Sequence, residues 1–391
     1  MINFAIDLAT LTYHAIAGTK TERLDDIVAR ETPVTSIIPA YNEGVSLIDA
    51  VHSQLNQTNI PRRIIIADDH SSDDTMRIGQ ELASRYPNVT YERNEQNLGK
   101  AATINRILRA YDASLTDRIL ITDGDTQLEP QTVEALASRF TDDAVAAVTA
   151  NGILKPSGTG LSRLIHQGKA ASFNVFAFRK RAQSLRNAVS VVNGSCTMYT
   201  ADSLRQHPFP ERTKTEDTDH TWMLLEAGNK VLYEPRAVNF STDIEGVRDH
   251  YKQTHRWFSG SWQSLYTHGR DLGKAPSLAY TTVHPSFAEG GVYSLLYLVG
   301  LPALGAAHLI APDSVPATWF LAGLAADAAY TALPILAVDP KSIRHLPGIY
   351  AYKTIAAAGF LDSGVRTSAQ AALGQRERWS NRWTRERKGE V

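Results

Sequence analysis

The sequence predicts an α/β fold with a mostly parallel central sheet, followed by transmembrane or interfacial helices at the carboxyl end. Between about residues 32 and 270, mixed helical stretches alternate with short apolar β-branched runs such as VTSIIPA, RRIIIADD, RILITDGD and AVAAVTA. Strands separated by helices of this length are typical of βαβ units and of a sheet covered by helices. Beyond about residue 287, long uncharged runs replace this alternation. A chain of 391 residues also exceeds one ordinary core, so we expect a large domain with an appendage.

These features divide the chain into four predicted parts. They are an amino-terminal amphipathic segment (1–31), the α/β domain (32–270), a membrane region with two or three helices (271–373) and a basic cytoplasmic tail (374–391). The first part, which begins MINFAIDLATLTYHAIAGTK, lacks a basic leader and is interrupted by Asp7 and His14. That pattern favours a short helix resting on protein or bilayer over a signal peptide or a span.

The charge balance and the cysteine count exclude some classes of protein. The formal net charge is −1, with 40 Lys and Arg against 41 Asp and Glu. This balance offers no electrostatic footprint for nucleic acid, so no nucleic-acid partner is expected. The single cysteine, Cys196, excludes an internal disulfide framework and suits a reducing compartment or a domain that faces the cytosol.

Two nearly uncharged runs predict membrane spans. No Asp, Glu, Lys or Arg occurs between residues 290 and 312, and VYSLLYLVGLPALGAAHLI can cross a ~30 Å hydrocarbon layer at ~1.5 Å per residue. A second run, residues 316–338, contains one charge, Asp327. The third stretch, LPGIYAYKTIAAAGFLDSGV, carries a lysine and an aspartate, and it is either a third span or an interfacial helix.

The basic tail sets the expected orientation. Arginine residues gather after residue 373, and basic residues next to membrane segments favour the cytoplasmic side. If the α/β domain is cytoplasmic, two spans return the chain to that side. We therefore favour two spans plus a re-entrant or interfacial helix, and the alternative is a soluble protein in which these helices are buried.

Acidic pairs follow two of the predicted strands. Asp68 and Asp69 end RRIIIADD, where a carboxylate can accept a hydrogen bond from a nucleotide base or ribose; a helix N-cap cluster is the alternative. Asp123 and Asp125 form a D-x-D whose central glycine permits a turn that aims both acids at one point. Because Mg²⁺ and Mn²⁺ prefer carboxylate and phosphate oxygens, we expect a divalent metal at this turn. Ligands of such sheets bind beyond the carboxyl ends of the strands, where both pairs fall.

Three further segments carry candidate binding and catalytic groups. In NLGKAATIN, a helix N-terminus and Lys100 suit a phosphate, and an exposed loop lysine is the alternative. In KTEDTDH, Asp217 is the candidate general base for an acceptor hydroxyl. Glu216 beside it is either an acceptor- or diphosphate-binding residue or a first-turn residue stabilised by the helix dipole. In QTHRW, Arg256 fits a diphosphate and Trp257 a sugar ring, unless the segment is only an aromatic-rich helix at a membrane surface.

Together these motifs resemble the processive family-2 glycosyltransferases that make hyaluronan, chitin, poly-N-acetylglucosamine and cellulose. The resemblance spans about residues 32–262 and rests on PAYNE, DDxSxDxT, NxGK, DGD, NGSC, TED with a following Asp, and QxxRW. It implies a GT-A fold, a UDP-sugar donor, a divalent metal and inversion at the anomeric carbon. The roles it implies are nucleotide binding for Asp69, ribose and metal binding for Asp123 and Asp125, base catalysis for Asp217, and acceptor and diphosphate binding for Gln253, Arg256 and Trp257.

The chain departs from those synthases in its membrane region. They usually have helices before the catalytic domain and several after it, whereas here the amino end offers no convincing span and the carboxyl end offers two or three. Either several copies or a separate export subunit complete a channel, or the glycan is not exported.

The predicted function is that of a membrane-associated inverting β-glycosyltransferase whose catalytic domain faces the cytoplasm. It would transfer a sugar from a UDP-sugar, UDP-N-acetylglucosamine or UDP-glucose, to the non-reducing end of a growing polysaccharide. One alternative is a single addition to a lipid or protein acceptor. Another is an inactive nucleotide-sugar-binding scaffold, although intact Asp125 and Asp217 argue against it. A nicotinamide oxidoreductase is excluded because no G-x-G-x-x-G follows the first strand.

Overall fold

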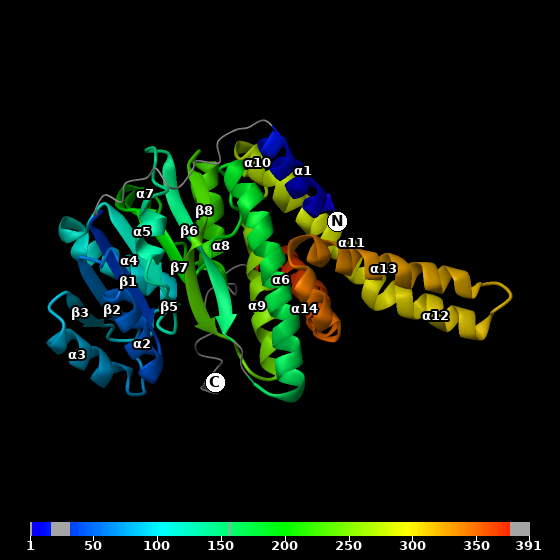
Figure 1. Ribbon diagram of the computed structural model, residues 1–391, viewed down its shortest axis with the longest axis horizontal. Coiled ribbons are helices and arrows are strands. Elements are labelled where there is room, and N and C mark those ends of the chain that lie inside the picture. The colour runs from blue at the N-terminus through cyan, green and yellow to red at the C-terminus, as the bar shows by residue number, and fades with distance from the viewer. Residues whose placement is uncertain (1, 17–31, 156–157, 376–391) are drawn as a thin grey trace.

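An eight-stranded mixed sheet forms the centre of the protein in a computed structural model that describes residues 2–16, 32–155 and 158–375 (Figure 1). The strands lie in the order β3-β2-β1-β4-β7-β6-β8-β5. Their bounds are β1 (Val34–Ala40), β2 (Arg63–Asp68), β3 (Val89–Arg93), β4 (Arg118–Thr122), β5 (Gln127–Leu128), β6 (Val145–Lys155), β7 (Cys196–Thr200) and β8 (Lys230–Thr242). Strands β1 to β4 run parallel, β7 is antiparallel to both of its neighbours, β6 and β8 pair in parallel, and β5 pairs antiparallel with β8.

Helices surround the sheet and extend beyond it. Their bounds are α1 (Ile2–Ile16), α2 (Gly44–Leu55), α3 (Thr75–Arg85), α4 (Lys100–Tyr111), α5 (Thr132–Ala137), α6 (Gly160–Leu185), α7 (Ala201–Gln206), α8 (Glu216–Glu226), α9 (Val247–His268), α10 (Pro276–Leu278), α11 (His284–Leu295), α12 (Leu301–Ile310), α13 (Ala317–Val338) and α14 (Leu346–Ala372). Two π-helical segments, Ala279–Val283 and Leu296–Gly300, join α10, α11 and α12 into one continuous helical rod.

The parallel half of the sheet is buried on both faces. In β1, Ile37 packs in the cluster that includes α4, whereas Ile38 packs in the cluster that includes α2 and α3. Because successive side chains of a strand point to opposite faces, this alternation places apolar residues under helices on both sides. The prediction of an α/β fold with a mostly parallel sheet is therefore confirmed. The antiparallel strand β7, in the segment that follows NGS, was not foreseen.

Helices α6, α9 and α14 stand beside the sheet (Figure 1). Helix α14 packs against both α6 and α9, and α1 packs mainly against α6. Asp7 of α1 is almost fully buried and pairs with Arg179 of α6 (3.0 Å) and with Arg186, which directly follows α6 (2.7 Å). The predicted amino-terminal helix therefore rests on protein along at least one face, while Leu8 and Tyr13 remain exposed.

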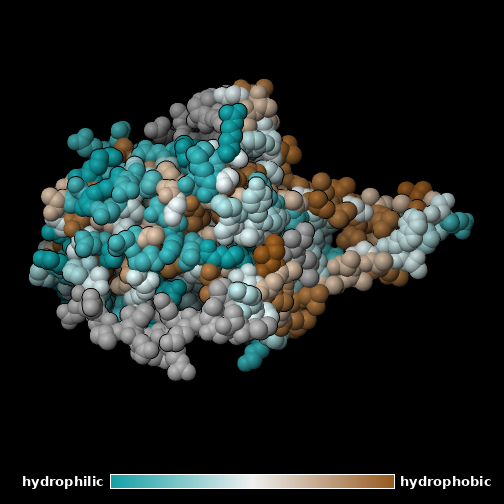
Figure 2. Space-filling model, turned by 90° about the horizontal axis from the view of Figure 1, so that it is seen from above, coloured by the Kyte–Doolittle hydropathy of each residue, from teal (hydrophilic) through white to brown (hydrophobic). Residues whose placement is uncertain are grey.

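Two helices of the carboxyl-terminal region are long and apolar enough to cross a membrane, judged by length and composition. They are Pro276–Ile310 and Ala317–Val338. Helices α12 and α13 project from the rest of the protein as a hairpin, and hydrophobic residues gather along it and beside it (Figures 1 and 2). Leu309 and Ile310 near the hairpin tip are each 84% exposed. Exposed apolar surface of this kind marks a site that contacts a membrane or another protein.

The one acidic residue of α13 is fully partnered. Asp327 accepts hydrogen bonds from the Lys353 ammonium of α14 (2.6 Å) and from the hydroxyls of Tyr293 (2.6 Å) and Tyr350 (3.0 Å). Pairing of this kind lowers the cost of a charge inside an apolar helix. The predicted basic tail lies outside the described residues apart from its first two positions.

Candidate active site

The loops after β1, β2 and β4 meet at one edge of the sheet because these three strands are adjacent and parallel. Asp68 closes β2 and is fully buried. It accepts hydrogen bonds from the Ser71 backbone N–H (2.8 Å) and the Tyr91 hydroxyl (2.5 Å). Both contacts are internal, so Asp68 fixes the shape of the loop that leads to α3.

Asp69 connects this loop to the start of α4. Its carboxylate accepts hydrogen bonds from the backbone N–H groups of Leu98 (2.7 Å) and Gly99 (2.8 Å). The Asn94 side-chain amide donates to it as well, at 2.7 Å. Gly99 has φ 90°, a conformation that disfavours residues with a side chain, and α4 begins at the next residue. These three donors occupy most of the carboxylate and leave one lone pair of Oδ2 for a ligand.

Lys100 joins three of the motifs at one point. Its ammonium donates to Asp123 Oδ1 (2.5 Å) and to the Gly194 carbonyl (2.8 Å), and it lies 3.7 Å from Glu216 Oε1. Burial alone would lower the pKa of Lys100, but the charges of Asp123 and Glu216 outweigh it and raise the pKa. Lys100 is therefore a charged bridge between the DGD turn and α8.

The DGD turn concentrates negative charge. Burial, followed by the charge of Asp123, raises the pKa of Asp125 to about 6. Glu43, which ends the PAYNE motif, lies against this turn: a Cβ atom at Gly124 would come within 2.8 Å of its Cγ atom. Burial and the charges of Asp125 and Asp123 raise the pKa of Glu43 to about 7. The sequence motif contained Glu43, but its approach to the DGD turn depends on the adjacency of β1 and β4.

These oxygen donors fit a hard divalent cation. Among the described residues, no group of three or more His, Cys, Asp or Glu side chains is arranged to hold a metal ion. Two carboxylates are enough where the phosphates of a substrate complete the coordination shell, as Mg²⁺ commonly requires. Burial and then the charge of Asp123 raise the pKa of Asp125, and a bound cation would oppose both by favouring the ionised carboxylate.

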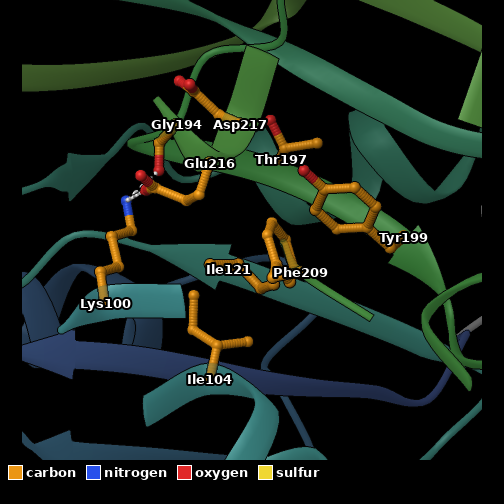
Figure 3. Close-up of a pocket in the computed structure, with 9 residues that line it drawn as sticks. All are labelled: Lys100, Ile104, Ile121, Gly194, Thr197, Tyr199, Phe209, Glu216 and Asp217. Carbon is orange, nitrogen blue, oxygen red and sulfur yellow. Dashed lines mark hydrogen bonds and ion pairs between the residues drawn. The ribbon is translucent and has the colours of Figure 1, made fainter. Parts of the chain in front are cut away.

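Asp217 lies in the first turn of α8, next to Glu216 (Figure 3). Burial and then the charge of Glu216 raise the pKa of Asp217 to about 6, while the charges of Lys100 and Arg256 oppose the rise. A Cβ atom at Gly194 would come within 2.7 Å of Asp217 Oδ2, so a glycine here makes room for the carboxylate. A carboxyl group with this pKa is ionised at neutral pH and can still accept a proton, as a general base must.

The pocket beside Asp217 combines charged and apolar walls. Figure 3 shows Lys100 pointing toward Glu216 and Gly194, with Ile104, Ile121 and Phe209 on the apolar side. The full set of lining residues is Lys100, Ile104, Ile121, Gly194, Thr197, Tyr199, Phe209, Glu216 and Asp217. A charged wall and an apolar wall therefore meet beside the Asp217 carboxylate.

A buried network holds α8 in place. Asp219 accepts hydrogen bonds from Arg212 Nη2 (2.8 Å) and Arg212 Nε (3.0 Å), and His268 Nε2 lies 2.8 Å from it. The other ring nitrogen of His268 lies 2.7 Å from Glu226. Burial alone would lower the pKa of His268, but these two carboxylates raise it to about 9. His268 is therefore protonated at neutral pH and connects the end of α9 to α8, which carries Asp217.

Helix α9 carries the QTHRW residues into the same region. Gln253 and Trp257 are four residues apart and lie on one face of the helix, where both contact Lys169 of α6. Arg256 is close enough to lower the pKa of Asp217. The structure thus brings Lys100, Asp123 and Asp125 together with α8 and α9, and it places Asp68 and Asp69 in the neighbouring loop.

The fold is of the GT-A type, with a mostly parallel mixed sheet followed by long apolar helices. Residues 35–207 match the family model described as glycosyl transferase family 2. The resemblance inferred from the motifs is confirmed at this level. The mannosyltransferase PcManGT from Pyrobaculum calidifontis, solved in complex with GDP-Man and Mn²⁺, has the same fold with a TM-score of 0.58 and 20% identity. The similarity covers 94% of this chain and 99% of that one.

Distant homologues include bacterial sugar transferases. An uncharacterized glycosyltransferase, YaiP, from Escherichia coli K12 is 25% identical over 61% of this chain and 59% of its own. A poly-beta-1,6-N-acetyl-D-glucosamine synthase from Staphylococcus epidermidis is 26% identical over 59% of this chain and 55% of its own. An N-acetylglucosaminyltransferase from Rhizobium meliloti is 25% identical over 80% of this chain and 74% of its own. The matched region therefore spans less than two thirds of the first two relatives.

Proposed function

We propose that this protein is a metal-dependent, inverting β-glycosyltransferase that adds sugars from a UDP-sugar to the non-reducing end of a growing polysaccharide. The observation that carries the proposal is the position of Asp217. It lies next to the Lys100–Asp123 bridge, in a pocket whose burial and charges raise its pKa to about 6. Transfer of a sugar from a nucleotide sugar to a hydroxyl requires a base close to the groups that bind the phosphates.

The chemistry assigned to these residues is a single displacement. The acceptor hydroxyl oxygen forms a bond to the anomeric carbon as the bond from that carbon to the diphosphate oxygen breaks, which inverts the configuration. Asp217 takes the hydroxyl proton, and the electron pair of the broken bond leaves with the nucleoside diphosphate. Arg256 binds the diphosphate, and Trp257 supports an acceptor sugar ring.

The metal fits the acidic turn after β4. Asp123 and Asp125 would hold a Mg²⁺ or Mn²⁺ ion, with Glu43 adding negative charge beside them. When bound, such an ion offsets the charge of the diphosphate leaving group. Asp68 and Asp69 shape the loop that would receive the nucleotide, with one Oδ2 lone pair of Asp69 still open.

The exposed hairpin supports a membrane location. We infer that α12 and α13 enter the bilayer, that α14 stays at the interface, and that the glycosyltransferase domain faces the cytoplasm. Leu295, Leu296 and Val299, in and before the second π-helical segment, are each more than half exposed and extend the apolar surface toward the domain. A second copy of the chain or an export subunit would then line a path for the product.

Two of the relatives suggest the donor. They are described as a poly-beta-1,6-N-acetyl-D-glucosamine synthase and an N-acetylglucosaminyltransferase, which favours UDP-N-acetylglucosamine over UDP-glucose for this chain. Purified protein in detergent or lipid, incubated with Mn²⁺ and UDP-N-acetylglucosamine, UDP-glucose or GDP-mannose in turn, tests this choice. Mass spectrometry should detect a ladder of products from one UDP-sugar and none in EDTA.

Each other outcome of that experiment points to a different function. A single added sugar on a lipid or protein acceptor would replace elongation by one-step transfer. A product from GDP-mannose alone would overturn the UDP donor. Tight nucleotide-sugar binding with no product under any condition would favour the inactive scaffold.

A further inference from the structure

A buried ion pair lies beneath the QTHRW helix, outside the pocket around Asp217. Lys169 of α6 is 1% exposed, and its ammonium donates a hydrogen bond to Asp243, which follows β8 directly and is 4% exposed. The His166 ring lies 2.8 Å from the other oxygen of Asp243. Burial alone would raise the pKa of Asp243, but His166 and Lys169 outweigh it and hold the pKa below its usual range. Asp243 is therefore a buried anion that contacts Lys169 and His166 and also accepts a hydrogen bond from the Ile244 backbone N–H (2.9 Å).

The same lysine contacts both ends of the QTHRW motif. Its ammonium donates to Gln253 Oε1 at 2.7 Å and lies 5.2 Å from the centre of the Trp257 ring. Phe173, one turn further along α6, places its ring centroid 6.4 Å from that of Trp257. An ammonium within about 6 Å of an aromatic ring is attracted to the face of the ring. One charge thus fixes an amide and an indole that lie on the same face of α9.

The residue before Lys169 lies where α6 crosses α14 at close range. A Cβ atom at Gly168 would come within 2.0 Å of the Gly348 carbonyl oxygen of α14, so the two backbones are in direct contact at this crossing. Side chains at either position would push the helices apart. Lys169 therefore lies on a helix whose backbone packs directly against α14, and side chains held on packed helices support accurate sites.

The buried charge of Lys169 is better explained by function than by stability. A buried ion pair is weak support for stability, since well-packed apolar residues of similar volume often serve as well. Apolar residues would not hold the Gln253 carbonyl oxygen or attract the Trp257 ring. Lys169 contacts Gln253 and the ring of Trp257, and both residues lie on α9, so its effect reaches the reaction through α9.

We propose that Lys169 is a positioning residue that orients Gln253 and Trp257 for the acceptor, with Asp243 as its counter-ion. This inference rests on the proposed function of QTHRW in holding the acceptor. If it is correct, the contact between α6 and α14 also helps to hold the acceptor-binding residues in place. The loss of Lys169 should therefore impair transfer to the acceptor while leaving reaction of the donor with water nearly intact.

The test compares two variants with one control. Lys169→Met removes the cation, and Lys169→Met with Asp243→Asn removes both charges, so that no unpaired buried charge remains if the single variant misfolds. The matched control is Arg179→Met, which breaks a different α6 ion pair, that to Asp7 at 3.0 Å. For each protein, kcat and the acceptor KM of sugar transfer are measured beside the rate of donor hydrolysis.

We expect both Lys169 variants to lose on the order of 10²-fold in kcat/KM for transfer, as misplaced substrate-positioning groups commonly do. Hydrolysis should stay within about threefold of wild type, because uniform donor binding is untouched. The control should keep the wild-type ratio of transfer to hydrolysis. Equal losses in both reactions, or transfer by the double variant within about threefold of wild type, would overturn the inference.

A second measurement separates this inference from the proposed function. The fluorescence of Trp257 is isolated by subtracting the emission of a Trp257→Phe protein, and its quenching by acrylamide is compared with and without Lys169. Greater quenching in the double variant supports positioning even if the wild-type protein transfers no sugar, in which case the proposed function alone fails. Unchanged quenching contradicts the inference whatever the activity.

Discussion

The pH dependence of sugar transfer should reveal the environment of Asp217. Burial and the charge of Glu216 raise the pKa of Asp217 from 3.8 to about 6. This rise corresponds to about 3 kcal/mol of difference between the two protonation states. A general base acts only when ionised, so kcat/KM should be nearly constant above about pH 7 and fall as the pH drops through 6. The free enzyme would be ~90% ionised at Asp217 at about pH 7 and ~10% ionised at about pH 5.

The informative perturbation is Glu216→Gln, which removes a negative charge while keeping the shape of the side chain. The acid limb should then move to a pH between 3.8 and 6, because only burial still raises the pKa of Asp217. The wild-type rate should fall about tenfold between about pH 7 and about pH 5, and the variant rate should fall less. The pH midpoint of the acid limb does not depend on the maximal rate. A loss of rate caused by a binding role of Glu216 therefore leaves the midpoint interpretable.

The assay is initial-rate kcat/KM for the donor across a pH series, since this quantity reports the pKa values of the free enzyme. Glu81→Gln is the control, because it changes the net charge by the same amount at a side chain that is 67% exposed and lies on α3. Its profile should overlay that of the wild type. A wild-type midpoint near 3.8, or a Glu216→Gln profile identical to that of the control, would refute the reasoning.

Three further predictions follow from the other charged groups. His268 has a pKa raised to about 9 from 6.5, so it stabilises the fold most fully below pH 6.5, and this contribution is lost as the pH rises through 9. The thermal midpoint of the wild type should therefore drop more between about pH 7 and pH 10 than that of His268→Gln, and parallel curves would contradict this. Asp125→Ala should abolish metal-dependent transfer and weaken UDP binding in Mn²⁺ but not in EDTA; full wild-type activity in EDTA would count against the metal. A carboxyl-terminal reporter should be active in the cytoplasm, and activity only outside it would reject the two-span topology.

Local sequence patterns predicted the parallel half of the sheet because its strands have clear sequence signals. Runs such as RRIIIADD and RILITDGD are apolar, β-branched and end in acidic turns, and the structure places those turns after β2 and β4. Strand β7 escaped this reasoning. Its sequence, CTMYT, is short and mixed, and its antiparallel insertion between β4 and β6 depends on pairing between distant segments.

The contacts within the site could not be predicted from the sequence either, because they join residues that are far apart along the chain. Lys100 begins α4 as expected, yet its ammonium is bound to Asp123 and Gly194, which are 23 and 94 positions away. Glu43 approaches the DGD turn only because β1 lies beside β4. Asp243, the counter-ion of Lys169, lies 74 positions further along the chain. Periodicity can place a residue on a helix face, but it does not identify the side chain opposite.

The most direct test of the account is the Asp217→Asn protein, with donor binding and sugar transfer measured side by side. Removing the base should leave the affinity for the UDP-sugar near that of the wild type, because the interaction with the acceptor proton arises only in the transition state. Transfer should fall by at least ~10²-fold, the lower bound for the loss of a general base. Sugar transfer at the wild-type rate by the Asp217→Asn protein would contradict the central claim.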